Sequence, residues 1–220
     1  MLRKSSMLAG LALALLLFRP GDAFAGPPLL CHPFEIGAAA SLEWGDDWNR
    51  PHAGFDLQRL GERTEALLSP GTPVIARMET LRRAAIYASR DGQALAEVQV
   101  RLDARIAAAA SADARALALF DAGYFSETLE DVVRLQGYDM PGIGRVDAAA
   151  LRRAGAGRDG YASIVKALSL RPGDAAMHFA AALVARADAR GDEAQRHARL
   201  ARAGAAADGL LARNLGQTAM

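Results

Sequence analysis

Apolar residues recur every three or four positions along most of the chain, and no segment alternates apolar and polar residues over the length of a strand. This spacing places apolar side chains on one face of an α-helix. The pattern is clearest at Leu95, Val98, Leu102 and Ile106. Alanine is abundant, and it favours helix because it loses no side-chain entropy on ordering. The sequence therefore predicts an all-α protein.

Turn-forming residues divide this pattern into separate helices. The segment 69–73 (SPGTP) ends the first helix, with Thr72 as N-cap and Pro73 as first residue of the next helix. A break at Ala122-Gly123 splits one long apolar stretch in two. Further along the chain, Asp174 is expected to cap the helix that starts at Ala175. The expected helices cover residues 55–67, 73–90, 95–106, 113–121, 125–136, 146–154, 161–170, 175–188, 193–203 and 210–215.

The C-terminal part contains two helical segments that are split by Arg190-Gly191-Asp192 and preceded by a Pro-Gly-Asp turn. This arrangement resembles the tetratricopeptide repeat, a two-helix unit of about 34 residues. The repeat has small residues where its two helices touch. A unit that starts at Ala175 places Ala182, Ala194 and Ala201 at those positions.

One unit further upstream, Gly160, Ala167 and Pro172 fall where the repeat has small residues and a proline. Units that start at Ala109 and Ile75 match less well. The resemblance implies an αα-hairpin solenoid, in which each hairpin buries its apolar face against the next. An unrelated helical bundle is the alternative.

A solenoid of this kind implies a concave groove, lined by the first helix of each unit, that binds a protein or peptide. The alternatives are that the same positions are ordinary core and surface sites, or that the N-terminal arm occupies the groove. Charged and aromatic residues are mixed among the groove positions, as at many interfaces. The resemblance assigns to the groove Glu79, Arg83, Ile86, Tyr87, Asp113, Leu117, Phe120, Asp121, Phe179, Leu183 and Arg186.

The N-terminus has the three parts of a secretory signal peptide. Arg3 and Lys4 precede an apolar run of 11 residues at 8–18, and Ala23-Phe24-Ala25 supplies small residues for cleavage between Ala25 and Gly26. The run is shorter than the ~20 residues that span a membrane. A lipoprotein acylated at Cys31 fits less well, because Leu30 precedes it where a small residue is expected. We therefore expect a periplasmic or secreted protein.

The expected domains are a signal peptide (1–25), an extended N-terminal arm (26–53) and a helical-repeat domain (54–220). The arm is rich in proline and glycine, and its Trp44 and Trp48 flank a turn that we expect to pack on the helices. Without residues 1–25 the chain has 23 basic and 24 acidic residues. This balance gives no electrostatic reason to expect binding to nucleic acid or to an anionic membrane, and we expect no stable membrane insertion after cleavage.

Cys31 is the only cysteine, so no disulfide forms within one chain. Cys31-His32, with Asp46, Asp47 and His52, has residue types that bind metals, but the spacing matches no zinc or haem motif.

No catalytic motif is present either, so we expect no cofactor and no catalytic residues. His178 is expected in the core and His197 in water. The leading hypothesis is an exported, non-enzymatic interaction or scaffold module. The alternative is a metal- or haem-linked accessory protein, or an enzyme, that uses Cys31 and His32.

Overall fold

A computed structural model describes residues 29–135 and 143–218 of the chain. The signal peptide and the cleavage position between Ala25 and Gly26 lie outside these residues. The described residues form helices and loops without a β-strand, which confirms the all-α prediction. The α-helices are α1 (Leu60–Leu67), α2 (Val74–Ala88), α3 (Gly92–Ala108), α4 (Ala112–Arg134), α5 (Ala148–Gly155), α6 (Gly160–Leu170), α7 (Ala175–Ala187), α8 (Gly191–Gly204) and α9 (Gly209–Asn214).

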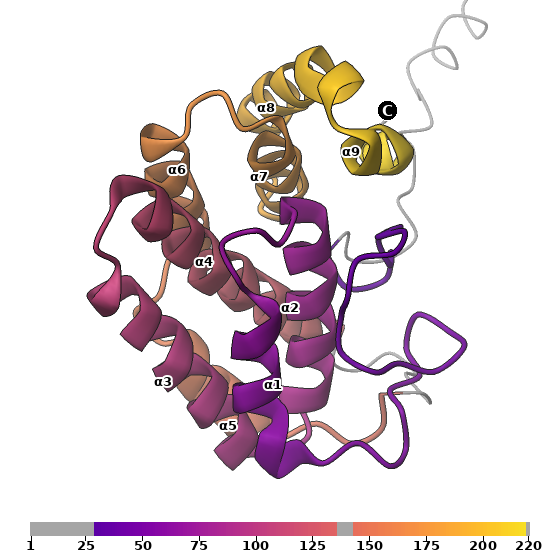
Figure 1. The fold of residues 1–220 in the computed structure, drawn as a ribbon. Helices are drawn as coiled ribbons and strands as arrows, with labels where there is room; N and C mark the ends of the chain where they lie inside the picture. The colour runs from indigo at the N-terminus through magenta and orange to yellow at the C-terminus, as the bar shows by residue number, and fades with distance from the viewer. Residues whose placement is uncertain (1–28, 136–142, 219–220) are drawn as a thin grey trace, which may run out of the picture.

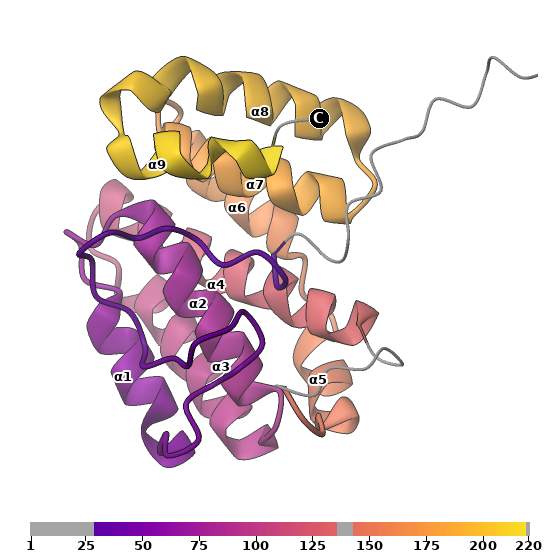
Figure 2. The ribbon, with the colours of Figure 1, turned by 90° about the vertical axis from the view of Figure 1, so that its right-hand side faces the viewer.

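The helix α2 lies at the centre of the molecule, with α1 and α4 packed against it (Figure 1). α3 packs on α1 and α4, and α6 lies along α4. The chain then continues into α7 and α8, which pack against each other. Residues 29–56 contain no helix and cross the remaining face of α2 as an extended segment, which we call the arm (Figure 2). α2 is thus covered on every side, and 14 of its residues are buried.

Polar side chains at the helix N-termini explain where most helices begin. Each accepts a hydrogen bond from a backbone N–H of the first turn, which has no partner within the helix. The prediction for Asp174 is confirmed, because its side chain accepts from the Met177 N–H. The prediction for Thr72 is wrong: α2 begins one residue later with Pro73 as N-cap, and the Thr72 hydroxyl donates to the Leu67 carbonyl. The same type of cap is made by Asp91, Ser111, Asp147, Asp159 and Asp208.

The break predicted at Ala122-Gly123 is also wrong, since α4 runs without interruption from Ala112 to Arg134. Gly123 lies where α6 crosses α4. A Cβ atom at Gly123 would be 2.6 Å from the Gly160 carbonyl oxygen, and one at Gly160 would be 2.5 Å from the Gly123 carbonyl oxygen. The glycine therefore lets two backbones approach closely and does not end the helix.

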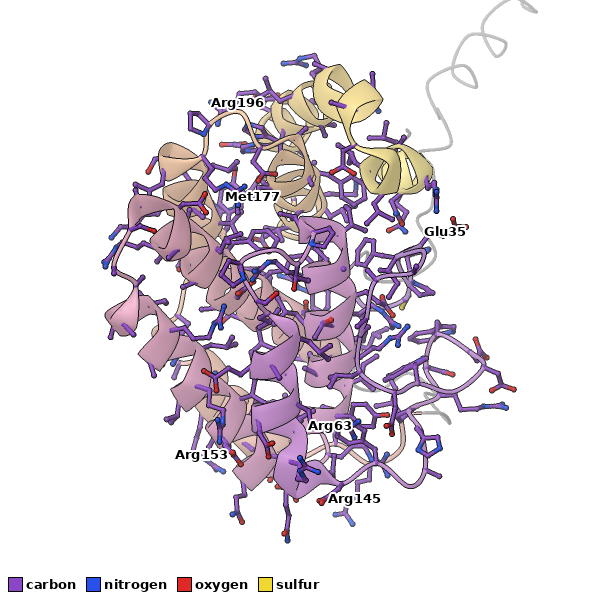
Figure 3. The ribbon with its side chains drawn as sticks, in the orientation of Figure 1. Glu35, Arg63, Arg145, Arg153, Met177 and Arg196 are labelled. Atoms are coloured by element: carbon purple, nitrogen blue, oxygen red, sulfur yellow. The ribbon has the colours of Figure 1, made fainter. Side chains whose placement is uncertain are left out.

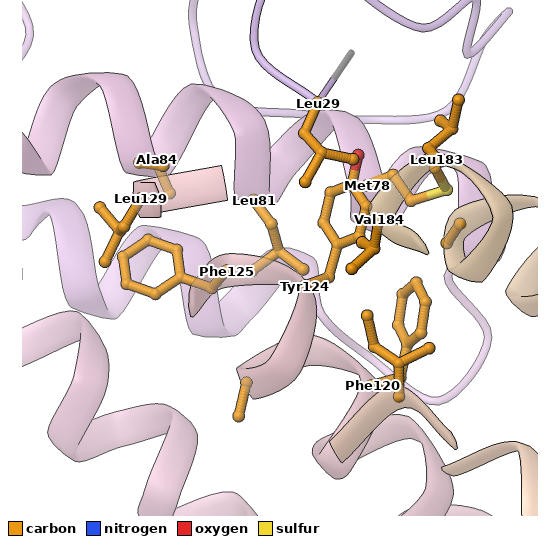
Figure 4. Packing of buried hydrophobic residues seen from close by; sticks show 14 of the residues in the cluster. Leu29, Met78, Leu81, Ala84, Phe120, Tyr124, Phe125, Leu129, Leu183 and Val184 are labelled. Carbon is orange, nitrogen blue, oxygen red and sulfur yellow. The ribbon is translucent and has the colours of Figure 1, made fainter. Parts of the chain in front are cut away.

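The core joins the arm to three helices. Leu29 of the arm, Met78 of α2, Phe120 and Tyr124 of α4, and Leu183 of α7 belong to one buried cluster, and each is at most 3% exposed. Figure 4 shows these side chains converging from their separate elements. The arm therefore contributes to the hydrophobic core of the helical part.

The two helical histidines pair in the interior. His197 is 2% exposed, so the expectation that it faces water is wrong, whereas His178 is buried as expected. The two Nδ1 atoms lie 2.9 Å apart, and His178 Nε2 is 3.0 Å from the Pro172 carbonyl oxygen. Because a carbonyl oxygen can only accept a hydrogen bond, we assign the His178 proton to Nε2. His178 Nδ1 is then the acceptor, and His197 Nδ1 carries the proton that it donates to His178 Nδ1.

This pair predicts a loss of stability in acid. Burial, with the nearby charges of His178 and Arg196, lowers the His197 pKa to about 4, against the opposing effect of Glu193. The Tyr161 ring lies edge-to-face with the His197 imidazole, with the two ring centroids 6.3 Å apart. Since the folded pKa lies below the usual 6.5, the unfolded chain binds more protons between these values, and stability falls as pH drops from about 6.5 toward 4.

The expected change is about 2 kcal/mol in the free energy of unfolding between pH 7.5 and pH 5. Urea unfolding of the wild type and of His197→Gln at both pH values measures the contribution of the histidine pair, because titrating groups remote from the pair cancel in the difference. His52→Gln is the control, since His52 is exposed. Equal pH dependence in the wild type and in His197→Gln would contradict the prediction.

Candidate functional site

Most residues assigned by sequence to an open groove lie in the interior. Asp113 is exposed and Arg83 and Arg186 are half-buried, but the remaining positions are at most 3% exposed. They therefore form no open groove, and a partner cannot reach them in this structure. The buried positions are Glu79, Ile86, Tyr87, Leu117, Phe120, Asp121, Phe179 and Leu183.

The arm covers the α2 positions and binds them through its backbone. Glu79 accepts the Phe34 N–H at 3.1 Å, and Arg82 donates to the carbonyl oxygens of Leu30 and Trp48 at 3.1 and 2.9 Å. Glu79 and Arg82 pair with each other at 2.8 Å although both side chains are fully buried. Burial opposes ionisation of Glu79, but the hydrogen bond and charge of Arg82 outweigh it and hold the Glu79 pKa below its usual value.

Further contacts of the same kind fix the arm along its length. Arg83 donates to the Leu42 carbonyl at 2.5 Å and pairs with Glu79 at 2.6 Å. The Tyr87 hydroxyl donates to the Glu43 carbonyl at 2.7 Å and accepts the His52 N–H at 2.9 Å. Near α9, the Asn214 amide binds both backbone groups of Glu35, whose position Figure 3 shows. The face that sequence assigned to a partner thus holds the chain's own arm.

Asp121, another predicted groove residue, anchors the α1–α2 turn. Its Oδ2 pairs with Arg77 at 2.7 Å, and both side chains are fully buried. Arg77 also donates to the carbonyl oxygens of Leu68, Ser69 and Thr72. This buried network ties the turn to α4, so the role of Asp121 is structural.

No three of the residues with metal-binding side chains in the described part of the arm have ligand atoms within 4.8 Å of one another. The carboxylate of Asp46 pairs with Arg50, and that of Asp47 accepts the Trp48 N–H in its own turn. Burial, with the nearby charge of Asp131, raises the pKa of the half-buried Cys31 thiol to about 11. Metals bind the thiolate, so this environment disfavours a metal at Cys31.

A charged hollow of about 580 Å³ lies where α4, the start of α6 and the α7–α8 turn meet. Arg134 is its central cation and bonds to Asp131 and Asp188 at 2.7 Å each and to Glu130 at 3.3 Å. None of the lining residues offers a hydroxyl, thiol or imidazole nucleophile, and the ionised groups suit the binding of charged ligands. The hollow is lined by Glu127, Glu130, Arg134, Arg158, Asp159, Ala187, Asp188, Ala189 and Arg190.

Glu127 is the most perturbed group of this hollow. Its side chain is 2% exposed; Oε1 accepts the Tyr161 N–H at 2.7 Å, while the buried Oε2 has no hydrogen-bond partner. Burial raises the Glu127 pKa to about 7, and the negative charges of Asp188 and Glu130 add to the rise. Oε2 therefore has the capacity to accept a hydrogen bond or to bind a cation.

Ala189, in the turn between α7 and α8, has a backbone φ of +57° and lines the same hollow. It is the only non-glycine residue with positive φ among the residues that the structure describes. This left-handed conformation costs about 1–2 kcal/mol for a residue with a Cβ atom. The charged residues next to it in the chain, Asp188 and Arg190, also line the charged hollow.

An apolar groove of about 390 Å³ adjoins the charged hollow between α4 and α5. Leu129, Val133, Leu151 and Ala154 give it an apolar lining, and Val133 is 39% exposed. Glu130 and Arg134 line both the groove and the hollow, so the two form one continuous surface. Ser126, Arg152 and Gly155 complete the lining of the groove.

The repeat pattern in the sequence did not indicate this joint surface. The repeat pattern assigned binding to first helices of evenly spaced units, whereas the surface depends on α5, which interrupts that spacing. The acidic run at Glu127, Glu130 and Asp131 was visible. However, nothing in the pattern brings Asp188 next to it.

Comparisons with protein-family models, with curated proteins and with solved structures gave no match for this chain. Within residues 29–135 and 143–218, none of the helices combines the length and the apolar character that a membrane span requires.

Proposed function

We propose that this protein is a non-enzymatic binding module that takes a short polypeptide segment on the joint surface of the apolar groove and the charged hollow. The observation that carries the proposal is the continuity of the two, since Glu130 and Arg134 line both. The groove offers burial to an apolar side chain, and the carboxylates beside it offer ion pairs to a basic one. The preferred segment therefore has an apolar residue next to Lys or Arg.

The location of this activity is part of the proposal. The N-terminal pattern of Arg3, Lys4, the apolar run and Ala23-Phe24-Ala25 supports export by a signal peptide. We propose a periplasmic or secreted protein whose partner is a protein or peptide in the same compartment. No observation in the described residues favours the alternative function based on Cys31 and His32.

We also propose that α4 with α6, and α7 with α8, are two hairpins similar to tetratricopeptide repeats. The close approach of Gly123 and Gly160 supports the first pair, because the repeat has small residues at this crossing. The proposal changes the register of the upstream unit. Its first helix is α4 and not the helix at residues 146–154, and the segment with α5 is an insertion between the two helices. This insertion supplies one wall of the apolar groove.

The hairpin proposal predicts which alanines of α7 and α8 tolerate a larger side chain. Ala182 and Ala194 are 2% and 7% exposed, and replacing either with leucine is expected to lower the free energy of unfolding by about 1–3 kcal/mol. Ala189→Leu is the control, expected within about 0.5 kcal/mol of the wild type because the native alanine already carries the cost of the positive φ. Thermal unfolding compares the three variants. Equal melting temperatures would contradict the proposed register.

Selection of displayed peptides on the protein without residues 1–25 tests the binding proposal. Enriched peptides are expected to carry an apolar residue next to Lys or Arg, and Val133→Glu is expected to abolish their binding. Val100→Glu is the matched control, since Val100 is 66% exposed on α3 and lines neither the groove nor the hollow. Peptides that bind both variants equally, or that share no basic residue, would overturn the proposal.

A further inference from the structure

Three carboxylates from two separate parts of the chain meet in the charged hollow. Glu127 and Glu130 are three residues apart on α4 and so project from the same face. Asp188 follows the last residue of α7. One oxygen of each residue lies within 4.8 Å of those of the other two.

A second observation shows that this cluster is more than a group of surface acids. Glu127 is 2% exposed and lines the hollow, and its buried Oε2 has no hydrogen-bond partner. Its other oxygen is held by the Tyr161 N–H, so the carboxylate has a fixed orientation. Buried polar atoms of folded proteins nearly always have a partner, so this oxygen is available to a bound cation.

The local charge balance also favours a cation. The carboxylates of the hollow and those paired with its arginines number six, against three guanidinium groups, which leaves an excess of three negative charges when all six are ionised. Arg158 contributes little to the centre, because Asp103 binds it through two hydrogen bonds of 3.1 and 2.6 Å. The six are Glu127, Glu130, Asp131, Asp159, Asp188 and Asp103, and the three are Arg134, Arg158 and Arg190.

We propose that Glu127, Glu130 and Asp188 bind a Ca²⁺ ion in the charged hollow. A purely oxygen-based ligand set suits hard cations. Ca²⁺ binds oxygen at about 2.4 Å, so ligand oxygens up to about 4.8 Å apart can share one ion, and water completes its irregular shell. Mg²⁺ binds at about 2.1 Å in a strict octahedron and gives up its water reluctantly, so three carboxylates from two separate elements suit it less than they suit Ca²⁺.

The ion competes with one guanidinium group. Arg134 Nη2 bonds to Asp188 at 2.7 Å and to Glu130 at 3.3 Å, and Ca²⁺ binding displaces it from both. Arg134 keeps a partner after this displacement, because its Nη1 bonds to Asp131 at 2.7 Å. Glu130 belongs both to this site and to the joint surface, so a bound Ca²⁺ competes with the basic residue of a peptide. A titration with CaCl₂ in the absence of peptide tests the ion site separately from peptide binding.

Isothermal titration of the protein without residues 1–25 with CaCl₂ tests the site directly. We expect one site with a Kd of about 0.1–1 mM, the range of extracellular calcium modules, and weaker binding of MgCl₂. Glu127→Gln is expected to weaken Ca²⁺ binding at least about tenfold, while Gln keeps an acceptor for the Tyr161 N–H. Glu62→Gln on α1 is the matched control and is expected to bind as the wild type does, since its side chain is exposed and outside the hollow.

Two further variants keep the test valid if Glu127→Gln folds poorly. Glu130→Gln changes a partly exposed side chain and is expected to weaken binding without loss of fold. Arg134→Gln removes the competing guanidinium and is expected to bind Ca²⁺ more tightly than the wild type. No saturable binding below about 10 mM Ca²⁺ would overturn the proposal. So would unchanged affinity in folded Glu127→Gln and Glu130→Gln.

Discussion

Replacing Glu79 with alanine is expected to lower the free energy of unfolding by about 3–5 kcal/mol. The change leaves the fully buried Arg82 without its paired carboxylate. It also removes the acceptor of the Phe34 N–H, which is one of the contacts that hold the arm on α2. Urea unfolding measures the loss, and amide hydrogen exchange at Phe34 is expected to become faster than in the wild type.

Glu62→Ala is the matched control for this variant. Its ion pair with Arg59 also spans one helical turn, but both side chains are more than half exposed. The expected loss is much smaller than for Glu79→Ala, because solvent screens such pairs. Similar losses in Glu79→Ala and Glu62→Ala would show that the buried cluster does not hold the arm on α2.

Replacing Gly160 with alanine is expected to lower the free energy of unfolding by about 2–3 kcal/mol. The new Cβ atom would lie 2.5 Å from both the Gly123 carbonyl and Glu127 Oε1. Because the carbonyl belongs to the backbone of a continuous helix, α4 and α6 must separate to make room. The same change disturbs the hydrogen bond that the Tyr161 N–H donates to Glu127 Oε1. Thermal unfolding measures the loss of stability.

Gly155→Ala is the control for this crossing, because a Cβ atom at Gly155 meets nothing within 4 Å. It is expected to be neutral or slightly stabilising, as alanine restricts the unfolded chain more than glycine does. Gly123→Ala should resemble Gly160→Ala. The double variant should lose less than the sum, because the helix separation that one substitution forces also makes room for the other. An effect of Gly160→Ala no larger than that of Gly155→Ala would contradict the close approach.

The helices were predictable because their signals are local. Apolar spacing and capping residues such as Asp174 act within one or two turns, so a single sequence shows them. The break predicted at Gly123 failed because a glycine that ends a helix and a glycine that admits a neighbouring helix look alike in sequence. Only the position of Gly160 on the opposite helix distinguishes the two cases.

The candidate site depends on contacts that no local pattern encodes. Glu79, Arg83 and Tyr87 were singled out as residues that bind a polypeptide, and they do bind an extended segment, but it is the arm of the same chain. The charged hollow needs α4 and the α7–α8 turn to meet, which brings Asp188 to Glu127. Burial of His197 likewise follows from its pairing with His178 across two helices.

We expect the joint surface around Val133, and not the arm-covered face of α2, to receive a polypeptide. A photoreactive amino acid at Val133, in cells that produce the full chain, tests it most directly when compared with the same amino acid at Val100. We expect cross-links at Val133 to a polypeptide segment with an apolar residue next to Lys or Arg, identified by mass spectrometry. An absence of cross-links at Val133 beyond those at Val100 would show that the joint surface does not receive a polypeptide.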